Sequence, residues 1–230
     1  MSFSKIPTIR GKSEIAPLLT YLTDHVQDSA FVCGGYVRWM CSPHYKPAVP
    51  RDVDVYCKDE KTYDELYKLF DTLDMPKREN PISAEFRVTT RDYTHRFFGL
   101  PPIQLIKPIK SGSVVTKGEL EEILNSFDFT VIRIGLVSID QALADDDFYE
   151  HEKKKKLVIK NIHCPISSSF RFMKYYKKGY WPKLTEIVKL FMDWDNRDDE
   201  YRERIRLLVI KKDKLTKEEI MELEALMRID

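Results

Sequence analysis

The sequence predicts an α+β fold in which a mixed β-sheet flanked by helices is followed by a small all-helical C-terminal region. Up to about residue 150, short apolar and β-branched runs alternate with amphipathic helical patterns, which is typical of a sheet covered by helices. Beyond that point the pattern is basic and mainly helical. At 230 residues, the chain suits one ordinary domain with an appendage. We therefore predict a first domain at 1–150 and a basic helical region at 151–230.

The first domain is expected to alternate helices with strands. Residues 13–27 place Ile15, Leu18 and Leu22 on one face, which indicates an amphipathic helix. The same periodicity predicts further helices at 37–40, 61–73 and 118–125. Apolar runs predict strands at 31–33, 51–56, 84–92, 103–106 and 127–137. We expect 84–92 to pair with 103–106, and Arg133 to be exposed on the last strand.

The basic helical region is expected to begin with a short strand at 157–159. Helices follow over about 167–178, 184–194 and 197–210. Ser167 or Ser168 can cap the first of them. Thr216, with Glu219 three residues later, forms a capping box that predicts the start of a last helix.

The charge of the chain is unevenly distributed. The net charge is only +1, but residues 151–189 contain 11 basic and 2 acidic residues. Such a patch suits a polyanionic partner, although the lysine run at 153–156 is also typical of a solvated linker. The four cysteines have no metal-ligand spacing. Without a secretory pattern or a membrane-length apolar run, we expect a cytoplasmic protein.

One motif carries most of the chemical information. Gly34 and Gly35 precede a helix, and a strand containing Asp52 and Asp54 follows. Strand residues two apart point to the same face, so both carboxylates converge and need a cation between them. Hard oxygen ligands suit Mg²⁺. The glycines allow the backbone to approach an anion such as a triphosphate.

These motifs resemble the head domain of the DNA polymerase β-like nucleotidyltransferase superfamily. The branch it resembles most is that of the bacterial-type tRNA CCA-adding enzymes and poly(A) polymerases, in its compact phage and large-virus form. The resemblance spans about residues 28–182, and it includes Ser126-Phe127-Asp128-Phe129-Thr130 and the helix Phe170-Arg171-Phe172-Met173-Lys174-Tyr175 before Gly179-Tyr180. Residues 1–150 are then expected to be a palm-like head, and 151–230 a neck-like region.

The resemblance implies a Mg²⁺-dependent enzyme that moves a nucleoside monophosphate from an NTP, ATP or CTP, to the 3′ hydroxyl of a tRNA-like RNA. Two Mg²⁺ ions would be held by Asp52 and Asp54, with Asp128 as the third ligand. The triphosphate would lie at the two glycines, with Arg38 or Arg51 offsetting its charge; Arg51 is equally an ordinary surface residue or a partner of Asp54.

Two departures from the family pattern weaken this assignment. The family's third carboxylate aligns with Gln104, a poorer Mg²⁺ ligand, so that either Asp128 completes the set or the chain is a pseudoenzyme that binds nucleotide or RNA without chemistry. The family's base-reading element E-D-x-x-R aligns with 167–171, where only Arg171 is kept. Arginine has no acceptor, so strict selection of C and then A is not expected.

The acceptor is expected to bind the helix that carries Arg171. Lys174, Lys177 and Lys178 share one face, and Tyr175 lies among them. Cations and aromatic rings together can neutralise phosphates and stack bases, whereas packing against the head is an equal alternative for the rings. A protein or small molecule as acceptor, as in toxin-like or regulatory nucleotidylation, also remains open.

Overall fold

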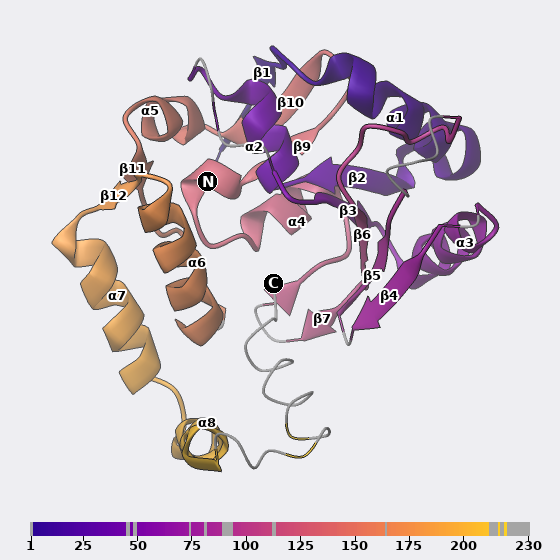
Figure 1. The fold of residues 1–230 in the computed structure, drawn as a ribbon. Coiled ribbons are helices and arrows are strands. Elements are labelled where there is room, and N and C mark those ends of the chain that lie inside the picture. The colour runs from indigo at the N-terminus through magenta and orange to yellow at the C-terminus, as the bar shows by residue number, and fades with distance from the viewer. Residues whose placement is uncertain are drawn as a thin grey trace.

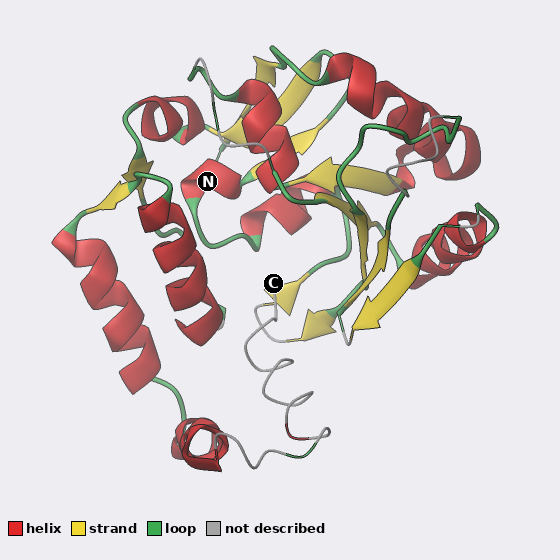
Figure 2. Cartoon of the chain, viewed as in Figure 1, coloured by secondary structure: helices red, strands yellow, loops and turns green. Residues whose placement is uncertain are grey.

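The computed structural model describes residues 2–44, 47, 50–73, 75–80, 82–88, 94–111, 114–163, 165–211, 216 and 219. Helices and strands alternate through most of the chain, and a helical region follows (Figures 1 and 2). No described helix combines the length and the apolar character that crossing a membrane requires.

Eight strands form one mixed sheet in the order β1-β10-β9-β2-β3-β6-β5-β4 (Figure 1). They are β1 (Phe3–Pro7), β2 (Ala30–Cys33), β3 (Val53–Cys57), β4 (Lys77–Asn80), β5 (Ser83–Phe86), β6 (Ile103–Ile106), β9 (Ile134–Leu136) and β10 (Gln141–Asp145). β3 and β6 run parallel, and the other pairs are antiparallel. The predicted α+β class with a mixed sheet is confirmed. The strands β1, β4 and β10 were not predicted from the sequence.

The two faces of the sheet serve different purposes. Helices α1 (Lys12–Val26), α2 (Gly35–Cys41) and α3 (Glu60–Asp71) contribute apolar side chains to the largest core cluster, which also contains Val53 and Val55 of β3. Tyr56 points to the opposite face and joins a second cluster with α4 (Leu120–Asn125). Because strand residues alternate between faces, Asp54 lies on the side of Tyr56.

The segment predicted as one strand over 127–137 is instead broken. A short bridge at Phe129 is followed by a 3₁₀ turn, Thr130–Ile132, and only then by β9. The expectation that Arg133 is exposed is wrong, because its side chain is fully buried and pairs with Asp145 of β10 at 3.0 Å. The turn allows this guanidinium to reach inward, where the carboxylate compensates its charge.

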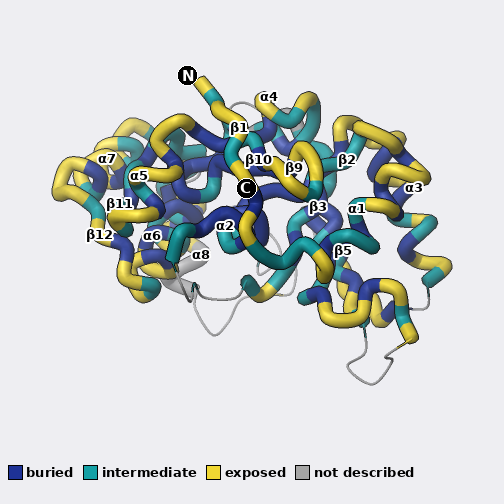
Figure 3. Tube along the Cα trace, turned by 90° about the horizontal axis from the view of Figure 1, so that it is seen from above, coloured by how far each residue is buried: buried dark blue, intermediate teal, exposed yellow. Residues whose placement is uncertain are grey.

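The C-terminal region packs on the head through one apolar cluster. Its helices are α5 (Phe148–Lys153), α6 (Pro165–Lys177), α7 (Leu184–Asp195) and α8 (Asp199–Lys211). Two short strands, β11 (Lys156–Leu157) and β12 (Trp181–Pro182), pair in parallel. Phe129 and Val131 of the head pack with Phe172 and Tyr175 of α6. Figure 3 shows α7 at one end of the molecule and α3 at the other.

Two further expectations for this region can be compared with the structure. Thr216 and Glu219 form the reciprocal hydrogen bonds of the predicted capping box. The proposed boundary between 150 and 151 falls inside α5, so it divides a helix rather than a linker.

Candidate active site

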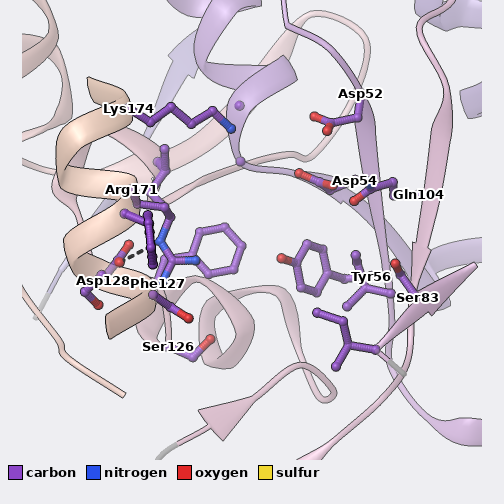
Figure 4. Close-up of a pocket in the computed structure, with 18 of the residues that line it drawn as sticks. Asp52, Asp54, Tyr56, Ser83, Gln104, Ser126, Phe127, Asp128, Arg171 and Lys174 are labelled. Carbon is purple, nitrogen blue, oxygen red and sulfur yellow. Dashed lines mark hydrogen bonds and ion pairs between the residues drawn. The ribbon is translucent and has the colours of Figure 1, made fainter. Parts of the chain in front are cut away.

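A cleft of about 460 Å³ lies between the sheet and α6 (Figure 4). The strands β3 to β6 supply one wall, α6 with the segment after α4 the other, and the glycine pair one end. Its polar lining includes Gly34, Gly35, Asp52, Asp54, Arg78, Asn80, Ser83, Glu85, Gln104, Ser126, Asp128, His163, Ser167, Ser168, Arg171 and Lys174. One cavity therefore brings together eight of the residues predicted from the sequence: Asp52, Asp54, Gly34, Gly35, Asp128, Arg171, Lys174 and Tyr175.

Asp52 and Asp54 form the acidic centre of the cleft. Asp52 immediately precedes β3, and Asp54 lies within it between Cys33 of β2 and Gln104 of β6. The pKa of the Asp54 carboxyl is raised to about 7, chiefly by burial and also by the charge of Asp52, while the charge of Lys174 lowers it. Figure 4 shows Lys174 extending from α6 toward the two carboxylates. Such a pair is costly to keep ionised without a cation.

The glycine pair brings backbone against this centre. Gly34 has φ of 74°, a conformation that favours glycine, and its N–H donates to Ile134 O at 2.8 Å. A Cβ atom on Gly34 would lie 3.6 Å from Asp54 Oδ2, whereas one on Gly35 would meet no heavy atom within 4 Å. Open space therefore faces the backbone at Gly35, next to the carboxylates.

We expect Gly35→Ala to raise the free energy of unfolding by about 0.5–1 kcal/mol, because alanine restricts the unfolded chain and suits a helix. The added methyl group occupies the space in front of the backbone, so it should weaken binding of the triphosphate that the sequence motif predicts, with ATP as the probe. Gly34→Ala is the matched variant and should cost about 1–3 kcal/mol, since φ of 74° with ψ of −132° is a backbone conformation that residues with a Cβ atom rarely adopt. Melting curves and ATP titrations measure both effects; unchanged ATP affinity in Gly35→Ala contradicts a ligand at this position.

Arg171 and Asp128 form an ion pair on the α6 wall. Arg171 Nε donates to Asp128 Oδ2 at 2.7 Å, and the carboxylate is 3% exposed (Figure 4). The planar guanidinium is thus held in a fixed orientation along the cleft. The neighbouring Ser167 and Ser168 hydroxyls line the same wall, are buried, and lack a hydrogen-bond partner among the described residues.

The other predicted acceptor residues are only partly in the cleft. Tyr175 is 4% exposed and packs edge-on against Tyr180, so its ring serves the core as well as the cleft. Lys178 is half-buried over the Tyr175 ring, and burial, with Arg38, Lys174 and Arg51 nearby, lowers its pKa to about 8. Lys177 is exposed and lies outside the cleft lining.

Comparison with known proteins rests on structure alone. No protein-family model and no curated protein matches the sequence. Among solved structures, the Thermotoga maritima CCA-adding enzyme complexed with tRNA is 14% identical, with a TM-score of 0.55. A tRNA-processing enzyme in an apo form is 16% identical with a TM-score of 0.56, and a tRNA nucleotidyltransferase complexed with a primer tRNA and an incoming ATP analog is 17% identical with 0.52.

The chain has the nucleotidyltransferase fold. The three matches cover 98%, 98% and 93% of this chain, and 55%, 59% and 60% of the respective solved chains. The resemblance inferred from the motifs is confirmed at the level of fold. The chain spans little more than half the length of these structures.

Within this nucleotidyltransferase fold, Gln104 takes the register position beside Asp54 on the neighbouring strand. No three histidine, cysteine, aspartate or glutamate side chains in the described parts of the chain are close enough to hold a metal ion. Glu85 was not predicted from the sequence; it lies opposite Gln104 on β5 and lines the cleft. Glu85 could have been found by combining two sequence predictions. These are the alternation of side chains along a strand and the pairing of 84–92 with 103–106.

Two arginines predicted to bind nucleotide lie outside the cleft lining. Arg38 is 2% exposed, and its guanidinium contacts Glu152 of α5 at 3.1 Å and the Tyr180 hydroxyl at 2.7 Å. This placement corrects the expectation that it offsets triphosphate charge, since α2 directs it toward the C-terminal region. Arg51 is exposed just before Asp52.

Proposed function

We propose that this chain is a Mg²⁺-dependent nucleotidyltransferase that moves a nucleoside monophosphate from an NTP to the 3′ hydroxyl of an RNA. One observation carries the proposal: Asp52 and Asp54 share a cleft with the open Gly34-Gly35 backbone and with the cations Arg171 and Lys174. This combination provides for metal ions, an anionic substrate and a nucleoside in one place.

The donor set fits Mg²⁺ ions. Two carboxylates and the carbonyl oxygen of Gln104 are hard ligands. Burial and the charge of Asp52 raise the pKa of Asp54 despite Lys174, so a bound cation would favour its ionised form. We assign Asp52 and Asp54 as metal ligands. Bound Mg²⁺ would neutralise phosphate charge and lower the pKa of the attacking hydroxyl.

The chain's own residues position the substrates. The Gly35 backbone lets the triphosphate approach, and the ammonium of Lys174 offsets its charge from the opposite wall. Arg171 and the Ser167 and Ser168 hydroxyls offer hydrogen bonds to the nucleoside. The acceptor oxygen attacks the α-phosphorus in line as pyrophosphate leaves, so that positioning and electrostatics supply most of the acceleration.

An RNA acceptor is supported by the surface of α6 and by the structural matches. Lys177 and Lys178 extend the positive charge of the cleft beyond Lys174, in a region with an excess of lysines. Solved structures with this fold were obtained in complex with tRNA. ATP and CTP are the proposed donors.

Asp128→Asn separates two roles for Asp128. As a partner that orients Arg171, its loss should weaken ATP binding about 10- to 100-fold, the effect of losing a charge-assisted hydrogen bond. Arg171→Ala should give a similar loss, and Mn²⁺ affinity measured without nucleotide should be unchanged in both variants. Weakened Mn²⁺ binding in Asp128→Asn alone would make Asp128 the third metal ligand.

The function is tested by transfer of label from each of the four α-labelled NTPs, with Mg²⁺, to total RNA and total protein of a lysate. Labelled RNA that disappears in the Asp52→Ala/Asp54→Ala variant supports the proposal, and the preferred NTP defines base choice. A labelled protein band instead supports protein nucleotidylation. No label in either pool contradicts macromolecular transfer; ATP-induced thermal stabilisation then indicates a pseudoenzyme.

A further inference from the structure

A row of polar side chains crosses the cleft face of the sheet. Asp54 of β3 is in register with Gln104 of β6, and Gln104 with Glu85 of β5. All three line the cleft. Side chains in register on neighbouring strands lie on the same face and within reach of one another. Gln104 is therefore placed between two carboxylates, and Figure 4 shows it beside Asp54.

The hydrogen bonds of this row determine how the Gln104 amide lies. Gln104 Nε2 donates to Glu85 Oε2 at 3.5 Å. The other oxygen, Glu85 Oε1, accepts from Arg87 Nε at 2.6 Å, and the Glu85 side chain is only 15% exposed. An ionised carboxylate can only accept, so the NH₂ group of Gln104 must face Glu85. The amide oxygen then points the other way, toward Asp54.

We propose that Glu85 is a positioning residue that fixes the Gln104 amide so that its carbonyl oxygen completes the oxygen ligand set beside Asp54. This inference rests on the proposed Mg²⁺-dependent function. An amide oxygen is a suitable ligand for a hard cation, although it carries no charge. The oxygens of Gln104 and an ionised Asp54 repel each other when they face, and a cation between them turns this repulsion into a favourable arrangement. Glu85 thus compensates, one strand further out, for the missing carboxylate.

The test measures Mn²⁺ binding by electron paramagnetic resonance in the absence of nucleotide. Glu85→Gln allows the amide of residue 85 to donate or accept, so the orientation of Gln104 is no longer fixed. We expect about a tenfold loss of Mn²⁺ affinity, as for other groups that orient a metal ligand. Glu85→Asp keeps the charge but shortens the side chain beyond hydrogen-bond reach, and it should show a similar loss.

The matched control is Glu79→Gln on the neighbouring strand β4. Glu79 accepts from the Tyr67 hydroxyl and is not part of the cleft lining, yet its loss removes the same charge from the same end of the sheet. Its Mn²⁺ affinity should equal that of the unaltered protein. Equal affinities in Glu79→Gln and Glu85→Gln would overturn the inference.

A double-mutant cycle shows whether Glu85 acts through Gln104. Gln104→Met removes both amide atoms at similar volume, so adding Glu85→Gln to it should change Mn²⁺ affinity by less than twofold. Additive losses would mean that the charge of Glu85 acts directly, and would overturn the orientation mechanism.

Label transfer by the unaltered protein distinguishes failure of this inference from failure of the proposed function. Transfer with no effect at Glu85 refutes only this inference, whereas absence of both transfer and Mn²⁺ binding refutes the function as well.

Discussion

Asp54→Asn is expected to abolish nucleotide transfer, by about 10³-fold or more, and to make the metal-free protein more stable at pH 8. The activity loss follows from removing a carboxylate at the centre of the cleft that we propose as a metal ligand. The gain in stability follows from the environment of Asp54, where burial and the charge of Asp52 disfavour ionisation. A residue that stabilised the fold would show the opposite change.

The pH dependence of this gain has a definite sign. The folded-state pKa of Asp54 is about 7, compared with its ordinary value of 3.8, so the folded protein binds the proton more tightly. The free energy of unfolding therefore falls as pH rises from about 4 to about 7, and the penalty is complete above 7. Asparagine has no such penalty. The variant should match the unaltered protein near pH 4 and exceed it by roughly 4 kcal/mol at pH 8.

Urea denaturation in EDTA at the two pH values measures the difference. Asp64→Asn, at an exposed carboxylate of α3, is the control and should change neither activity nor stability by much. Asp52→Ala should also abolish transfer without lowering the melting temperature. A large loss of melting temperature in either cleft variant would show that the carboxylate is structural.

The largest loss of stability is expected at the buried pair of Arg38 and Glu152. Glu152→Ala should cost about 3–5 kcal/mol, because it leaves a guanidinium buried without its counter-charge. Both side chains are at most 2% exposed, and Glu152 also accepts from the hydroxyls of Ser42 and Tyr180. Urea or thermal denaturation measures the loss.

The double variant Arg38→Met/Glu152→Met should recover much of that stability, since it removes both charges and retains volume. Arg38→Met alone should be strongly destabilised but, where folded, should bind ATP with unchanged affinity. If Arg38→Met instead lost ATP affinity at unchanged stability, Arg38 would bind the nucleotide after all.

The residues that the sequence could locate are those whose position depends on local pattern. Gly34, Gly35, Asp52 and Asp54 belong to one strand–turn–helix–strand unit, so spacing alone brings them to the same place. The alternation that buries Val53 and Val55 behind the carboxylates follows from strand geometry.

Contacts between segments distant in the sequence could not be predicted from such local patterns. Arg38 reads as a helix residue next to the glycine motif, yet its partner Glu152 is 114 positions away. Asp128 pairs with Arg171 from another element, and Arg133 turns inward only because a 3₁₀ turn interrupts the expected strand. Partners of this kind depend on tertiary packing, which local propensity does not encode.

The pairing of the first strand with the last one of the sheet has a consequence for how the chain acquires its structure. Phe3 of β1 is opposite Asp145 of β10, so this sheet edge cannot form until almost the whole head has been synthesised. Closing so long a loop is slow compared with forming β2 and β3, which are close in sequence. We expect hydrogen-exchange protection to develop in β2 and β3 first and at β1 last, which would leave the N-terminal segment available to chaperones until then.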